Sequence, residues 1–64
     1  MTKEEIYRKV ESVDGLGGMT VNERLFATGL MDTFDKVKVK NRELARIILE
    51  AIRVDKPSIE KILK

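Results

Sequence analysis

The side chains of this sequence that could do chemistry are carboxylates and basic groups, because the chain contains neither cysteine nor histidine. Without cysteine the chain cannot form disulfides or thiolate metal sites, and without histidine it lacks the commonest zinc ligand and general base. Glu23 is the first carboxylate to consider. Its helical phase puts it on the side of Phe26 and Leu30, where burial would raise its pKa and suit it to acid–base catalysis. However, Thr20 and Glu23 also have the spacing of a helix capping box, and we favour this structural role.

Asp32 and Asp35 form the second candidate site, because they lie one helical turn apart, like paired ligands of a divalent cation. Hard cations need about six oxygen ligands, and one helix surface offers two. We therefore predict a solvated face, with no metal and no cofactor. The serines and threonines lack a base that would activate them as nucleophiles. The sequence thus favours a non-enzymatic protein, with a hydrolase that depends on Glu23 as a remote alternative.

Basic residues are concentrated after position 35, where they could contact phosphates. These residues are Lys36, Lys38, Lys40, Arg42 and Arg46. Glu43 and Glu50 lie three or four residues from the arginines, which is typical of an exposed helix face with ion pairs. The net charge is only +2. The connector before Arg42 also lacks the glycine turn of a helix-turn-helix motif, and the preceding helix looks too long. A weak nucleic-acid accessory protein using these five residues remains the alternative function.

The elements that must position these groups are helices. Thr2 and Thr20, each followed three residues later by glutamate, begin two of them, and Asn41 caps a third. We predict an all-α fold, a compact bundle of three main helices with a short C-terminal one, in a single domain spanning residues 1–64. The expected ranges are about 3–13, 21–37, 42–53 and 57–63. Residues 36–40 alternate like a strand but have no partner, so we interpret them as a helix end and connector.

Helical periodicity also predicts the core. Phe26, Leu30 and Phe34 share one face of the second helix, and we expect all three to be buried. The third helix has apolar residues over an arc of about 200°, which implies contact with more than one helix. Gly29 in a helix interior costs about 1 kcal/mol relative to alanine, which suggests that another backbone passes close by.

Val21 and Leu25 fall outside the main apolar face of the second helix. With Gly29 they define a candidate interaction surface, used by another protein or by a second copy of the chain. The alternative is that another helix of the same chain covers them. A chain of 64 residues buries only about 60% of the surface that its unfolded form exposes, and without cysteine or histidine it lacks the usual disulfide or zinc to stabilise it, so we expect a homodimer.

The run Met19–Asp35 resembles a group of short bacterial proteins. They share a Met-Thr-Val-Asn-Glu-Arg-Leu core followed by Gly-Leu-Met and an acidic-Phe-Asp segment. They also have a Ser-Ile-X-X-Ile-Leu end like residues 58–63. No activity is established for that group, so the resemblance implies bacterial origin and no functional residue.

These features together predict a small, non-enzymatic, cytoplasmic protein–protein interaction module. Its expected partner is another protein or a second copy. No apolar run approaches the roughly 20 residues needed to span a membrane, so no membrane partner is expected.

Overall fold

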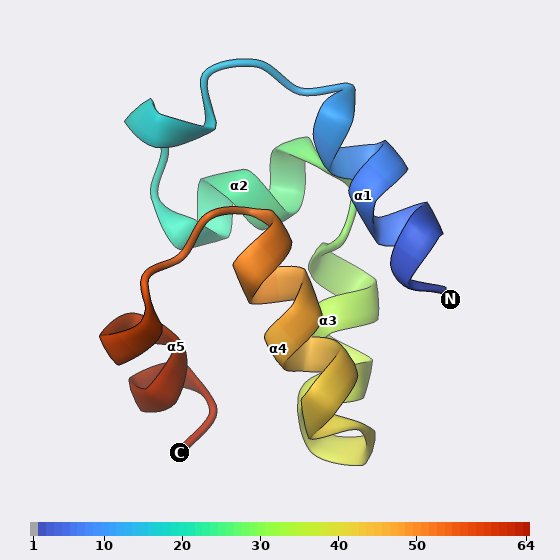
Figure 1. The fold of residues 1–64 in the computed structure, drawn as a ribbon, viewed down its shortest axis with the longest axis vertical. Coiled ribbons are helices and arrows are strands. Elements are labelled where there is room, and N and C mark those ends of the chain that lie inside the picture. Colours follow the sequence, from blue (N-terminus) through green and yellow to red (C-terminus); the bar gives the residue numbers. More distant parts are fainter. Residues whose placement is uncertain (1) are drawn as a thin grey trace.

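The computed structural model describes residues 2–64, and the regular structure in this range is helical (Figure 1). The elements are α1 (Lys3–Glu11), the short 3-10 turn η1 (Leu16–Gly18), α2 (Val21–Ala27), α3 (Met31–Lys40), α4 (Arg42–Ala51) and α5 (Lys56–Ile62). The prediction of a compact all-α fold is confirmed. The number of helices is not, because the expected second helix is divided in two.

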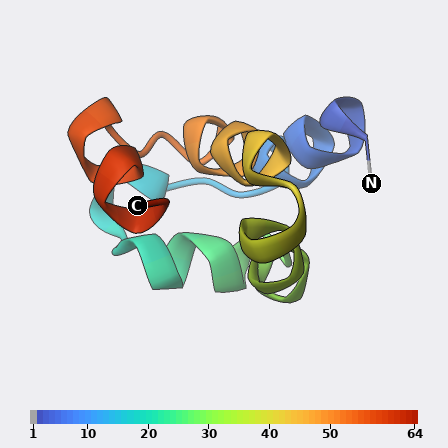
Figure 2. The ribbon, with the colours of Figure 1, turned by 90° about the horizontal axis from the view of Figure 1, so that it is seen from below.

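The helices form two layers, which Figure 2 shows from the side. One layer contains α1, α4 and α5, and the other contains α2 and α3. α4 lies at the centre and packs against α1, α3 and α5. Its buried residues Ala45, Ile48 and Leu49 are completely inaccessible to solvent. The prediction that this apolar helix contacts more than one other helix is therefore confirmed.

The predicted helix over 21–37 is interrupted at Gly29, which has a φ of 73°. The N–H of Leu30 donates to the carbonyl of Leu25 at 2.9 Å, and the N–H of Gly29 donates to the carbonyl of Phe26 at 3.1 Å. This pair of bonds is the Schellman motif, in which a left-handed residue ends a helix. The expectation of a close backbone at Gly29 is wrong. A Cβ built there would meet only Lys9 Nζ, at 3.8 Å.

The predicted helix starts are largely confirmed. Both capping boxes are present, at Thr2 and Thr20, and the Asn41 side chain accepts a hydrogen bond from the N–H of Leu44. The expected connector at residues 36–40 is wrong, because α3 continues through Lys40 and only Asn41 separates it from α4. Lysines suit this position because they lie near the negative C-terminal end of the helix dipole.

Candidate interaction surface

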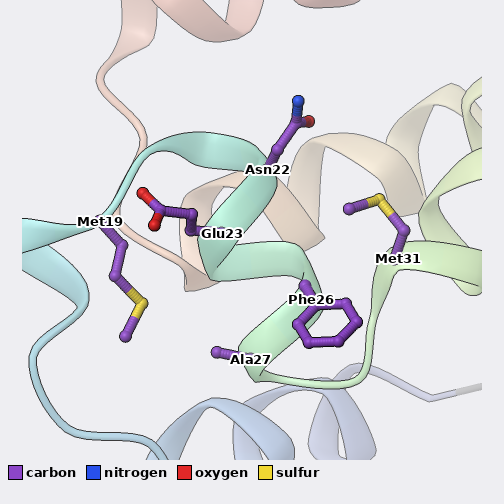
Figure 3. A pocket seen from close by; sticks show the side chains of 6 residues that line it. All are labelled: Met19, Asn22, Glu23, Phe26, Ala27 and Met31. Carbon is purple, nitrogen blue, oxygen red and sulfur yellow. The ribbon is translucent and has the colours of Figure 1, made fainter.

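An exposed apolar surface lies on α2 and the start of α3, where Phe26 is 79% exposed (Figure 3). We call it the Phe26 surface, and its residues are Met19, Asn22, Glu23, Phe26, Ala27 and Met31. Figure 3 shows Phe26 and Ala27 at the C-terminal end of α2, with Met31 across the turn on α3. The hollow between these side chains is wide open to solvent. It therefore has the form of a docking surface and not of an enclosed pocket for a small molecule.

The prediction that Phe26 belongs to the core is wrong. α2 has only seven residues, and its fully buried apolar position is Leu25, which is 2% exposed. Because α2 ends before Gly29, Leu30 and Phe34 enter the core from the separate direction of α3. Phe26, one residue past Leu25, is turned about 100° away from the core.

A sequence signal for this exposure existed. Asn22 and Glu23 lie one turn before Phe26 and Ala27, so two polar residues share the face of α2 that carries the phenylalanine. All four residues are exposed. Polar residues at the start of a helix face indicate that this face is exposed to solvent. Phe26 is the exception, an aromatic residue on a face that begins with polar side chains.

Glu23 belongs to this surface as a helix cap. The backbone N–H of Thr20 donates to Glu23 Oε1 at 2.9 Å, and the N–H of Glu23 donates to the Thr20 hydroxyl at 3.2 Å. The first of these bonds lowers the pKa of Glu23 below its ordinary value of 4.5. The favoured capping role is therefore confirmed, and the alternative of a buried carboxylate with a raised pKa is wrong, since Glu23 is exposed and its charged form is favoured.

Arg24 fixes the start of α2 against the rest of the molecule. Its Nε donates to the carbonyl of Met19 at 3.0 Å, and its Nη1 donates to the carbonyls of Ile52 and Arg53, each at 3.2 Å. These last two carbonyls lie at the C-terminal end of α4, where a cation is electrostatically favoured. Arg24 thus holds the loop that carries Met19 beside α2. No local pattern in the sequence indicates this role, because Ile52 and Arg53, which directly follow α4, are 28 and 29 positions away.

The three residues expected to form an interaction surface do not form one exposed patch. Leu25 lies in the core, and Val21 is half-buried and packs against it. Gly29 is exposed. Leu25 is therefore inaccessible to a partner, and the exposed apolar residue of α2 is its neighbour Phe26.

The five basic residues of the alternative hypothesis are all exposed. Lys36, Lys38 and Lys40 lie on α3, and Arg42 begins α4 after the one-residue turn (Figure 1). Among residues 2–64, the ion pair within 4 Å joins Lys38 to Asp35, at 3.6 Å. The network of ion pairs expected along α4 is thus not formed.

Other chemistry has little support in the part of the chain that the structure describes. Asp32 and Asp35 are exposed, and no group of three or more carboxylates there is placed to hold a metal ion. No helix in residues 2–64 has both the length and the apolar character needed to cross a membrane. In comparisons with protein-family models, curated proteins and solved structures, no match to this chain was found.

Proposed function

We propose that this protein is a small, non-enzymatic interaction module that binds a protein partner through the Phe26 surface. The observation that carries the proposal is the 79% exposure of Phe26. Full burial of such a side chain contributes roughly 1.5–3 kcal/mol, and aromatic residues often dominate the energy of protein interfaces. A partner that covers Phe26 gains this energy, which the isolated chain leaves unused.

The surroundings of Phe26 support the same function. Met19 and Met31 flank it, and methionine side chains adapt easily to the shape of a partner. Asn22 and Glu23 supply polar atoms beside them. An apolar centre with a polar rim is the usual composition of a protein–protein interface. The proposal keeps the expectation of a cytoplasmic module but moves the contact from Leu25 to Phe26.

Site-specific photo-crosslinking in the host cell tests this function. A benzophenone amino acid replaces Phe26 in one variant and Tyr7 in the other. Tyr7 is the matched control, because it is also an exposed aromatic residue but belongs to α1 in the opposite layer. We expect one defined protein, which can be a second copy, to be crosslinked from position 26 and not from position 7. Equal crosslinking from both positions, or none from position 26, would contradict the proposal.

A binding measurement with purified components then gives the size of the effect. Phe26→Ser should weaken binding of the crosslinked partner by at least tenfold, because loss of about 1.4 kcal/mol or more is expected at an aromatic anchor. Tyr7→Ser should bind as the wild type does. Equal affinities of wild type and Phe26→Ser would show that Phe26 is not the anchor.

The alternative function, weak binding to nucleic acid, is supported by a different observation. Lys36, Lys40, Arg42 and Arg46 are exposed without an ion-pair partner within 4 Å in residues 2–64. In addition, α2 and α3 are short helices joined through a turn that contains glycine, as in helix-turn-helix proteins. Against this interpretation, the first turn of α3 carries Asp32, which would repel phosphates.

Fluorescence anisotropy with duplex DNA and single-stranded RNA distinguishes the two functions. Affinity that falls steeply with salt supports the alternative, and no binding at low salt rejects it.

A further inference from the structure

The outer face of α3 carries a stripe of exposed residues. Asp32, Asp35, Lys36 and Val39 have the i, i+3, i+4 and i+7 spacing of a single helix face, and all four are exposed. Phe34, on the opposite side of α3, is buried against the core. Val39 is 79% exposed, as much as Phe26. α3 therefore has an unpartnered side with an apolar residue near its end.

The charges on this stripe are divided between the two halves of the helix. Asp32 and Asp35 lie in the N-terminal half and Lys36 in the C-terminal half, where Lys40 follows Val39 as the last residue of the helix. A helix with this division is complementary to an antiparallel copy of itself, because each acidic half then faces a basic half. A parallel copy would place like charges together.

The α3 stripe and the Phe26 surface belong to the same layer of the molecule. α2 and α3 form one layer, and α4 and its neighbours cover only one face of it (Figure 2). The α3 stripe lies opposite the buried Phe34, so it is on a side of α3 that faces away from the core. Met31 connects the two regions, because it is the first residue of α3 and also lines the Phe26 surface.

We propose that the partner covering the Phe26 surface is a second copy of this chain, bound about a two-fold axis with the two α3 helices antiparallel. This inference rests on the proposed function and specifies its partner. In this arrangement the Phe26 and Met31 end of one α3 lies beside the Val39 end of the other. Each half of the interface repeats the other, as closed two-fold symmetry requires.

The dimensions of the molecule set an upper limit on the area of such a dimer interface. The molecule measures 28 × 24 × 16 Å between Cα atoms, and its layers are stacked along the shortest dimension (Figures 1 and 2). A stable interface buries about 800 Å² per partner. The open face of α2 and α3 lies within the 28 × 24 Å cross-section of the molecule, so a stable dimer has to cover most of it. Dimerisation would also stabilise a domain whose small size limits its own core.

A charge-swap experiment tests the antiparallel arrangement. One variant, Asp32→Lys/Asp35→Lys, makes the stripe wholly basic, and the other, Lys36→Glu/Lys40→Glu, makes it wholly acidic. Each variant alone should self-associate at least tenfold more weakly than the wild type, because like charges now meet. An equimolar mixture should regain a dimer that contains one copy of each. Sedimentation velocity measures the masses, and native mass spectrometry identifies the mixed species.

Two controls keep the test decisive. The variant Lys61→Glu/Lys64→Glu changes the net charge by the same amount as the acidic variant but lies at the end of the chain, on and after α5 in the opposite layer, so it should dimerise like the wild type. Circular dichroism and thermal unfolding confirm that each variant is folded. If a swap variant unfolds, the single changes Asp32→Asn and Lys36→Gln replace it, and each should weaken the dimer without recovery on mixing.

The outcomes separate this inference from the proposed function. A wild type that remains monomeric up to about 1 mM, while position 26 crosslinks a different protein, overturns the dimer and leaves the interaction module intact. A wild-type dimer that survives in both swap variants overturns the antiparallel arrangement. Salt-dependent nucleic-acid binding by a monomeric wild type, with no crosslink from position 26, overturns both.

Discussion

α2 and α4 end in the same way, but with different residues at the critical position. In α2 the left-handed residue is Gly29, with a φ of 73°, and in α4 it is Arg53, with a φ of 66°. The N–H that follows each of them reaches back to a carbonyl five residues earlier, from Leu30 to Leu25 at 2.9 Å and from Val54 to Leu49 at 3.0 Å. The hydrogen-bond pattern is that of the Schellman motif in both cases.

The difference lies in what else stabilises each end. Glycine adopts a positive φ without steric cost, so the end of α2 needs no contact from outside. An arginine there costs roughly 1–2 kcal/mol. At the end of α4 the Arg24 guanidinium donates hydrogen bonds to the carbonyls of Ile52 and Arg53. The C-terminal ends of α2 and α4 together fix the orientation of α2. Arg24 fixes it against α4, Gly29 lets α3 turn away, and the face with Phe26 stays open.

Removal of the Arg24 contacts should have the largest effect on stability. Arg24→Met keeps the aliphatic stem but loses hydrogen bonds to three carbonyls, so we expect a loss of about 2 kcal/mol in the free energy of unfolding. Urea denaturation measures it. Arg46→Met, at an exposed position of α4, is the control and should change stability by less than about 0.5 kcal/mol. A similar small change for Arg24→Met would mean that α4 ends stably by itself.

Substitution of Gly29, the residue that ends α2, should have the next largest effect on stability. Gly29→Ala places a Cβ on a residue with positive φ, which should destabilise the fold by about 1 kcal/mol although the Cβ would make only an ordinary contact with Lys9 Nζ, at 3.8 Å. Gly17→Ala is the control, because Gly17 has open space for a Cβ and no positive φ. We expect its effect to be near zero or slightly stabilising. Equal effects of the two substitutions would contradict the assigned role of Gly29.

Gly29 and Arg24 also show what the sequence could and could not predict. The capping boxes at Thr2 and Thr20 are local patterns of four residues, and both were predicted correctly. Gly29 also had a local signal, since a glycine followed by leucine is typical of a Schellman end. The apolar period that runs on from Phe26 to Phe34 concealed it and predicted one long helix. Arg24 had no local signal, because its α4 carbonyls are brought to it only by the tertiary fold.

The same helix break at Gly29 explains why Phe26 is exposed. In an unbroken helix it would share the buried face with Leu30 and Phe34, as the periodicity predicted. Once the chain turns at Gly29, the two halves are independent, and Leu25 becomes the buried residue of α2. The exposed apolar side chain therefore lies on the same short segment as the predicted interaction surface, but it is Phe26 and not Leu25.

Replacement of Arg53, the left-handed residue that ends α4, by glycine should have a smaller effect on stability, and in the opposite direction. Arg53→Gly removes the steric cost at a φ of 66°, and we expect a stabilisation of about 0.5–1 kcal/mol. Arg24 contacts only the carbonyl of residue 53, so its hydrogen bond can persist. In contrast, Arg46→Gly inside α4 should destabilise the fold by about 1 kcal/mol. Thermal unfolding compares the two, and a loss of stability in Arg53→Gly would contradict this view of the α4 end.

The smallest expected effect concerns the start of α2 and its pH dependence. The Thr20 N–H lowers the pKa of Glu23 below 4.5 in the folded state, so ionised Glu23 stabilises the fold. This contribution is complete above the unfolded pKa and is lost as the pH falls through the lower folded pKa. Glu23→Gln keeps a capping side chain but no charge. The difference in Tm between wild type and variant should be constant above about pH 5 and shrink below pH 4.5; a difference that grows in acid would contradict the assignment.

The solution mass of wild type and Phe26→Ser as a function of concentration tests the central claim most directly, which is that a second copy covers the Phe26 surface. Phe26→Ser removes the exposed ring without touching Arg24 or Gly29, so the fold should be unchanged by circular dichroism. We predict that the wild type shifts from monomer to dimer as its concentration rises and that Phe26→Ser requires at least tenfold more protein for the same shift. Identical sedimentation of the two proteins at every concentration would contradict the account.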